Sequence, residues 1–201
     1  MPIVLAGGPS VTDYPRQAVT NMAGWGFTFA VNHVAFDFPC DVIVSIDPWM
    51  PKRNVDKLKA LGKPIITRPW EGFKELGLDF IYLPDNCFEK CYYSGMIAAK
   101  ISDALAKEDK WSKSYVLGID ASTGRYQGHK GDDIKWDYNK AHLDAYEAMG
   151  LEHTINLSIH SKVSCWPKYS KLPTPPKYAV LPEYRTTAIQ WLRDNAAGLF
   201  K

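Results

Sequence analysis

The sequence has no long apolar run and no recognisable leader segment. None of its runs approaches the ~18 consecutive apolar residues that a membrane-spanning helix needs. The start at Met1 lacks the charged segment, the apolar segment and the small-residue cleavage site of a secretory signal peptide. We therefore expect no membrane span, and we expect the protein in the cytoplasm.

Cysteine and excess charge are also scarce. The chain has four cysteines, and Cys87 and Cys91 have the spacing C-x3-C, which is neither a zinc-knuckle pair nor a C-x2-C redox pair. No second close pair completes a metal site, so we interpret the thiols as buried or incidental. The formal net charge is +2, which gives no general attraction to nucleic acid, although a local basic patch is compatible with it.

Strand-like and helix-like segments alternate along the 201 residues, a length that suits one domain. The predicted strands are rich in Val, Ile and Phe, which is typical of strands covered on both faces. They span residues 2–8, 27–36, 41–49, 64–70, 79–85, 114–120 and 153–159, and helices are predicted within 10–26, 51–63, 92–110, 133–152 and 183–200. The pattern predicts an α/β fold for residues 1–201: a single Rossmann-like domain with a mostly parallel sheet and helices on both faces. An irregular proline-rich segment, 166–182, precedes the C-terminal helix.

Small and polar residues follow the predicted strands, where ligands bind in parallel sheets. The first such stretch is "GGPS", which comprises Gly7, Gly8, Pro9 and Ser10. Its backbone N–H groups can approach a phosphate or ribose, or the stretch is simply a tight turn. Asn32 and Asp47 also close strands, and their side chains suit a base edge or ribose hydroxyls, or ordinary turn chemistry.

Two further strand-to-helix regions carry candidate site residues. Ser94 and Gly95 open the 92–110 helix, where Ser94 is expected as the N-cap and the helix end can hold an anion. Gly118 and Asp120 close the strand at 114–120, and "GRYQGHKGDD" follows them.

His129 in this loop is a candidate general base, since its unperturbed pKa of ~6.5 suits proton transfer near neutrality; the alternative is a solvated loop histidine. Arg125 and Tyr126 can neutralise a phosphate leaving group. Asp132 and Asp133 are better suited to starting the next helix than to binding a metal.

Six segments, taken in order, resemble the bacterial sialyltransferases that modify lipooligosaccharide. They are "VLAGGPSV", "FAVNHVAF", "SIDPWM", "YYSGMIAAKISDAL", "YVLGIDASTG" and "GHKGDDIKWDYNKAHLDAYEAMGL". The resemblance implies nucleotide contacts at Gly7, Gly8, Asn32, Ser94 and Gly95, a general base at His129, and assistance to the departing phosphate from Tyr126. It implies a CMP-sugar-like donor as substrate, with no metal and no other cofactor. Asp47 departs from the family, which commonly has asparagine there, and this chain is shorter.

Three other readings stay open on the same core. One is a diphosphokinase similar to the archaeal-type pterin enzymes, with magnesium held by Asp47, Asp120 and Asp132. Another is a modifier of nucleic-acid bases, given the many aromatics and the basic stretch "KRNVDKLK" at 52–59. The third is a nucleotide-binding module without catalysis. The C-terminal helix carries apolar Ile189, Leu192 and Phe200, which can pack on the sheet or join two copies of the chain in a homo-oligomer. The acceptor is not indicated.

Overall fold

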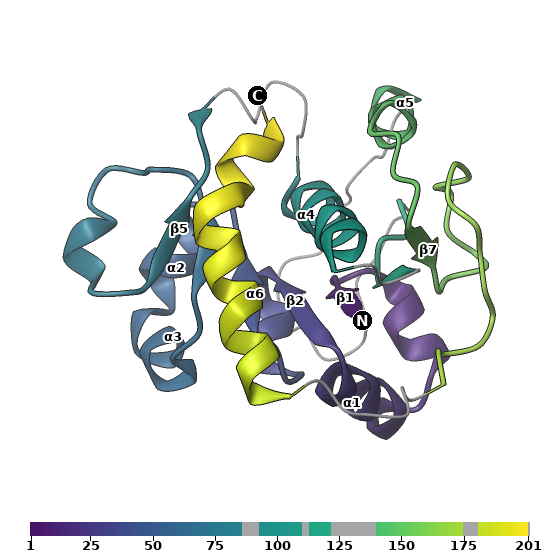
Figure 1. The fold of residues 1–201 in the computed structure, drawn as a ribbon, viewed down its shortest axis with the longest axis horizontal. Helices are drawn as coiled ribbons and strands as arrows, with labels where there is room; N and C mark the ends of the chain where they lie inside the picture. The colour runs from purple at the N-terminus through teal and green to yellow at the C-terminus, as the bar shows by residue number, and fades with distance from the viewer. Residues whose placement is uncertain (86–92, 110–112, 122–139, 175–180, 201) are drawn as a thin grey trace.

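The protein folds around one sheet of parallel strands. The computed structural model describes residues 1–85, 93–109, 113–121, 140–174 and 181–200. In these ranges the strands are β1 (Pro2–Leu5), β2 (Phe27–Val31), β3 (Val42–Val44), β4 (Ile65–Thr67), β5 (Phe80–Tyr82), β6 (Ser114–Leu117) and β7 (Thr154–Asn156). They form a seven-stranded sheet in the order β5-β4-β3-β2-β1-β6-β7, and every pair is parallel. Figure 1 labels β1, β2, β5 and β7 of this sheet. The predicted α/β fold class is confirmed.

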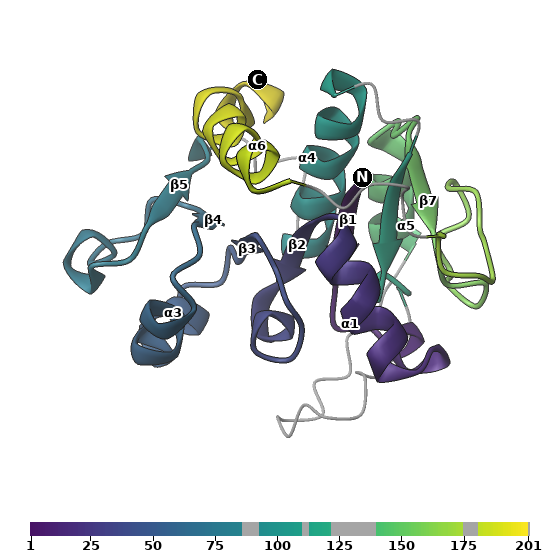
Figure 2. The ribbon, with the colours of Figure 1, turned by 60° about the horizontal axis from the view of Figure 1, so that its bottom comes forward.

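Helices cover both faces of this sheet (Figure 2). One face carries α4 (Ser94–Glu108), α5 (Lys140–Ala148) and α6 (Pro182–Asn195); the other carries α1 (Arg16–Trp25), α2 (Trp49–Arg53) and α3 (Val55–Leu61). Strand β1 shows why both faces are apolar. Val4 packs in the core under α4, whereas Ile3 and Leu5 pack in the core under α1, and all three are fully buried. This explains the lack of alternation in the sequence.

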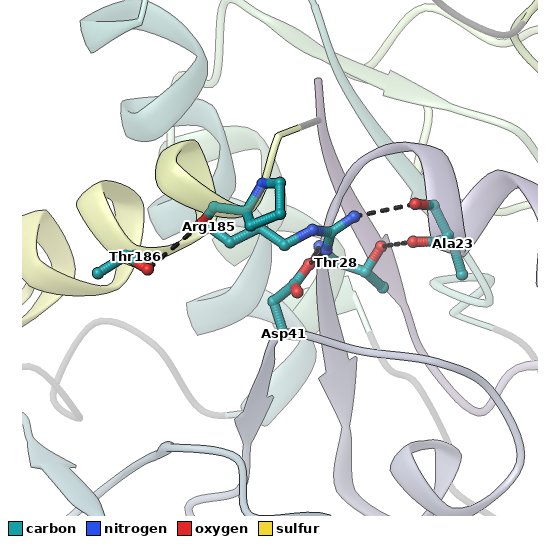
Figure 3. A network of polar contacts seen from close by, with 7 residues as sticks. Ala23, Thr28, Asp41, Arg185 and Thr186 are labelled. Carbon is teal, nitrogen blue, oxygen red and sulfur yellow. Dashed lines mark hydrogen bonds and ion pairs between the residues drawn. The ribbon is translucent and has the colours of Figure 1, made fainter. Parts of the chain in front are cut away.

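The C-terminal helix α6 packs on its own sheet and is tied to it by an ion pair between Arg185 and a buried carboxylate. Leu192 of α6 and Phe200 of the 3-10 helix that follows it, η5 (Ala196–Phe200), are buried in the main core. The Arg185 guanidinium donates to the Asp41 carboxylate and, at 2.9 Å, to the Gly24 carbonyl (Figure 3). Asp41 also accepts the Thr28 N–H at 2.8 Å. One carboxylate thereby links α6 to the start of β2.

Two elements differ from the sequence-based prediction. The apolar run 27–36 is not one strand, because β2 ends at Val31 and a 3-10 helix, η2 (Asn32–Phe36), follows it. Val34 and Ala35 are buried in this short helix, so the apolar residues that suggested a strand are core residues of a turn. The predicted helix at 51–63 is two helices separated at Asn54, and the second ends at Gly62 with a φ of 59°, as expected for a terminating glycine.

Within the described ranges, no helix is long and apolar enough to cross a membrane.

Candidate functional site

The order of the strands defines where a ligand crevice should lie. From β1 the chain moves outward through β2 to β5, and it returns through α4 to β6, on the other side of β1. The strand order therefore reverses between β1 and β6, and in parallel α/β sheets ligands bind at the carboxyl ends of the strands at such a point. The residues there are Gly7 to Ser10 after β1 and Gly118 to Asp120 after β6, both predicted from the sequence.

The ends of β1 and β6 are locked together through two glycines. The Gly8 N–H donates to the Gly118 carbonyl at 2.8 Å. A Cβ on Gly8 would lie 2.5 Å from both that carbonyl and Oδ2 of Asp120. Gly118 has a φ of 82°, and a Cβ there would lie 2.0 Å from the Ala6 carbonyl oxygen. Only glycine fits at these two positions, because the approach of one backbone to the other leaves no room for a side chain.

The carboxylate of Asp120 lies against the glycine-rich turn that follows β1. The side chain is only 5 % exposed, and Oδ2 accepts the Ser10 N–H at 2.7 Å. The Ser10 hydroxyl in turn accepts the Gly118 N–H at 3.0 Å. The Ser10 N–H is therefore already used, and the carboxylate disfavours a phosphate beside it. Oδ1 of Asp120 has no partner among the described residues, so it can accept a further hydrogen bond.

The residues after β7 contact the loop that follows β6. The Ser161 hydroxyl donates to the Ile119 carbonyl at 2.9 Å, and the Lys162 N–H donates to the Asp120 carbonyl at 2.8 Å. Asn156 reaches the same Ile119 carbonyl from β7 with Nδ2 at 3.3 Å. The loop after β6 is therefore held from both neighbours, which fixes the direction of the Asp120 side chain.

Asn32 and Asp47 form a pair at the ends of β2 and β3. The Asn32 amide donates to the Asp47 carboxylate at 3.3 Å. Asn32 has a φ of 53°, and among the described residues the one other non-glycine residue with positive φ is Ala121, at 48°, directly after Asp120. Such backbone conformations are costly and cluster at ligand sites. Asn32 follows β2 and Ala121 follows β6, so the two residues lie at the carboxyl ends of the strands on either side of β1.

Unpaired polar atoms concentrate along this same edge. Six buried side-chain polar atoms of the described residues lack a hydrogen-bond partner, and five of them follow or end a strand. They are Oγ1 of Thr67, Oγ of Ser45, Oδ1 of Asn32, Oδ1 of Asp120 and Oγ of Ser158. Buried polar groups are normally paired, so each of these atoms is open to a hydrogen bond from water or from a polar ligand.

Ser45, Thr67 and Ser158 were missed in the sequence. Each is the polar residue that closes an apolar run, in "VIVS", "IIT" and "INLS". The position of these three residues after a strand can be seen in the sequence, but a single hydroxyl at the end of a strand is common in ordinary turns. Only the structure shows that these hydroxyl oxygens lack a hydrogen-bond partner among the described residues.

The N-terminus of α4 lies at this edge, but Ser94 does not cap it. The N-cap is Tyr93, without a side-chain cap, and Ser94 is the first helical residue. Its buried hydroxyl accepts the Ile46 N–H at 3.1 Å instead, joining the helix to the end of β3. A Cβ on Gly95 would lie 3.7 Å from the Ile119 side chain, so the helix start also borders the end of β6. The predicted anion contact at this helix end stays a prediction.

The catalytic candidates His129, Tyr126 and Arg125 lie outside the described residues, as do Asp132, Asp133, Cys87 and Cys91. Of the described thiols, Cys165 is exposed and Cys40 is buried. Burial raises the pKa of the Cys40 thiol to about 12, so this thiol stays protonated and is not a nucleophile.

Asp47 and Asp120 are poorly placed to share a metal ion. They follow β3 and β6, which are three inter-strand steps apart in the sheet, or about 14 Å at the usual spacing. In the part of the chain that the structure describes, no three His, Cys, Asp or Glu side chains come together as metal ligands.

An aromatic hollow adjoins the edge beyond β3. Residues 69–75 and Tyr82 line an open concavity of about 580 Å³. The Nε1–H of Trp70 in this hollow donates to the Ile46 carbonyl at 2.9 Å. The N–H of the same Ile46 donates to the Ser94 hydroxyl, so the hollow lies near the start of α4.

The fold and the position of these residues define the class: a single α/β domain with a Rossmann-like parallel sheet. Comparison with known proteins takes the assignment no further, since no protein-family model, no curated protein and no solved structure matches the chain significantly.

Proposed function

We propose that the protein is a metal-independent glycosyltransferase that moves a sugar from a nucleotide-activated donor, similar to a CMP-sugar, to an acceptor hydroxyl. The observation that carries the proposal is the series of unpaired polar atoms at the carboxyl edge of the sheet. They are hydroxyl, amide and carboxylate oxygens, which suit the hydroxyl groups of a ribose and a sugar. Such a ligand supplies many donors and acceptors over several strands.

The roles divide between the two parts of the site. Asp120 and Asn32 would hold ribose or base atoms with their unpaired oxygens, supported by Gly7, Gly8 and Asp47 around them. Since the Asp120 carboxylate disfavours phosphate, the charge of the phosphate would be met by Arg125 and Tyr126.

His129, eight residues after Ala121 in the sequence, would deprotonate the acceptor hydroxyl. The leaving group would be a nucleoside monophosphate, while the acceptor oxygen forms the new bond to the anomeric carbon.

The separation of Asp47 from Asp120 favours this reaction over the magnesium-dependent diphosphokinase. A kinase of that kind needs these carboxylates close enough to bind ions that bridge phosphates. Their strands lie about 14 Å apart. The ordered resemblance of the six segments to sialyltransferases points in the same direction.

The test combines binding and turnover. Thermal unfolding is followed with cytidine, uridine, guanosine and adenosine mono- and diphosphates and with CMP-sugars, with and without magnesium; a ligand of the native state raises the Tm. Asp120→Asn should weaken the binding of the nucleotide by about 3- to 10-fold through one altered hydrogen bond. Asp194→Asn, an exposed change on α6, is the matched control.

Turnover is measured as release of nucleoside monophosphate from the CMP-sugar. His129→Ala should retain binding and lose release by about 100-fold or more. If no nucleotide raises the Tm, the proposal is wrong. Release that a chelator abolishes would contradict the metal-independent mechanism, and binding without any release would favour a non-catalytic module.

A further inference from the structure

One region of the surface combines stacked aromatic rings with unpaired cations. Its residues come from η2, α2 and α3, and we call it the Trp49 platform: His33, Phe36, Trp49, Lys52, Arg53 and Lys57. The His33 ring stacks on Trp49 with centroids 5.1 Å apart and planes 27° apart. Phe36 meets His33 edge-on at 5.8 Å. Trp49 is 37 % exposed although it is a large apolar side chain.

Two cations lie over the faces of these rings. The Arg53 guanidinium is 5.9 Å from the centre of the Trp49 ring, and the Lys57 ammonium is 5.4 Å from that of Phe36. Lys52, Arg53 and Lys57 are exposed, and none of them forms an ion pair with a described residue. Their charge is therefore available to an anion in solution.

Positive charge is concentrated here although the chain as a whole is almost neutral. Residues 49–63 contain five basic residues and one acidic residue, a net +4, whereas the whole chain carries +2. The rest of the chain is thus slightly acidic. A flat aromatic surface within a basic field fits a ligand with π-faces and regularly spaced negative charge.

We infer that the Trp49 platform binds single-stranded nucleic acid. An unpaired base would take the place of the Arg53 guanidinium over the partly exposed Trp49 ring, and the backbone phosphates on either side would contact Arg53, Lys57 and Lys52. A duplex hides its base faces, so it could use only the cations. The inference rests on the surface alone and does not depend on the proposed sugar transfer.

The position of the platform relates it to the carboxyl edge. η2 begins at Asn32, and α2 begins two residues after Asp47, so the platform borders the Asn32–Asp47 pair. Helices α2 and α3 lie together at one end of the sheet (Figure 1). A nucleic-acid strand bound to the Trp49 platform would pass close to the unpaired polar atoms at the carboxyl edge of the sheet.

The test is fluorescence anisotropy of a labelled oligothymidine of about 12 nucleotides, a length within the usual site size. The wild type should bind it more tightly than a duplex of the same length. Trp49→Ala should weaken binding at least about 5-fold, the smallest effect usual for the loss of one base stack. Tyr169→Ala, which removes an aromatic ring that is 51 % exposed elsewhere, should leave affinity unchanged.

The cations are tested by the dependence of affinity on salt. Arg53→Gln and Lys57→Gln should each reduce the slope of log affinity against log salt by about 0.7, as expected for one phosphate contact to a single strand. Lys107→Gln, an exposed change near the end of α4, is the control. Circular dichroism establishes that each variant is folded.

Four results would overturn the inference, and the first three are no binding by the wild type at low salt, tighter binding of the duplex, and unchanged affinity in all three platform variants. Binding that depends on the cations but not on Trp49 would reduce the platform to a general polyanion surface and would also refute it.

Discussion

Gly8 and Gly118 show how single residues determine the geometry of the crevice. The two glycines let the ends of β1 and β6 approach until backbone meets backbone, and this contact places the Asp120 carboxylate against the Ser10 N–H. A methyl group at Gly118 would meet the Ala6 carbonyl at 2.0 Å and would require a φ of 82°. The position is therefore far less tolerant than most of the glycines that the structure describes.

We expect Gly118→Ala to lower the free energy of unfolding by about 3 kcal/mol or more, from the left-handed backbone together with the overpacking. Gly24→Ala is the control, because a Cβ there meets nothing within 4 Å and the residue lies inside α1. This change should stabilise the protein by about 0.5–1 kcal/mol. Urea unfolding of both variants measures the difference, and similar values for the two would contradict the argument.

At the scale of elements, α6 offers two ion pairs of different burial. Arg185 contacts Asp41, whose side chain is 6 % exposed, whereas Arg193 contacts Asp79 at 2.6 Å with side chains 36 % and 51 % exposed. Water screens the second pair but hardly reaches the carboxylate of the first. The attachment of α6 should therefore depend on Arg185.

Arg185→Ala should lower the free energy of unfolding by about 3 kcal/mol, because it leaves the buried Asp41 carboxylate without its cation. Arg193→Ala on the same helix should change it by less than about 1 kcal/mol. Chemical unfolding monitored by circular dichroism distinguishes the two. Equal losses would show that both variants act only through helix propensity or packing.

The strands and the parallel sheet were predictable, but the bonding at the edge was not. Apolar runs rich in Val and Ile identify β1 to β7 because burial on both faces leaves a continuous pattern. The same rule misread Asn32–Phe36, where apolar residues are buried in a 3-10 turn. The N-cap assigned to Ser94 was wrong, since its hydroxyl bonds to Ile46, 48 positions away in the sequence. Local preference cannot anticipate a partner that only the fold brings near.

The candidate site was predictable to the extent that it follows the strands. Gly8, Ser10, Gly118 and Asp120 were named from their positions after apolar runs, and the fold brings these four together. That the carboxylate of Asp120 takes the N–H expected for a phosphate depends on the register of β1 with β6, which no sequence pattern encodes.

At the scale of the whole molecule, we expect the resistance to local unfolding to decrease from the centre of the sheet to its edges. Every residue of β1 and β2 is buried, with paired strands on both sides, whereas β5 is an edge strand whose outer residues are half-buried. Central strands open only with global unfolding, while edge strands open locally at lower cost.

Amide hydrogen exchange should therefore be slowest in peptides covering Ile3–Leu5 and Phe29–Val31, and at least about tenfold faster in those covering β5. Mass spectrometry of peptic fragments of the unmodified protein measures both sets in one experiment, so each is the control for the other. Equal protection of β5 and β1 would indicate that the domain unfolds in a single step.

The unpaired polar atoms at the carboxyl edge also bear on how this protein can evolve or be engineered. Each buried group without a partner costs about 1–3 kcal/mol, and five of them lie along one edge. Substitutions that fill this edge with apolar side chains would raise heat resistance and remove the groups available to a ligand. Selection for thermal tolerance and selection for binding therefore act in opposite directions at Ser45, Thr67 and Ser158, whereas Asn32 and Asp120 also carry hydrogen bonds that an apolar side chain would remove.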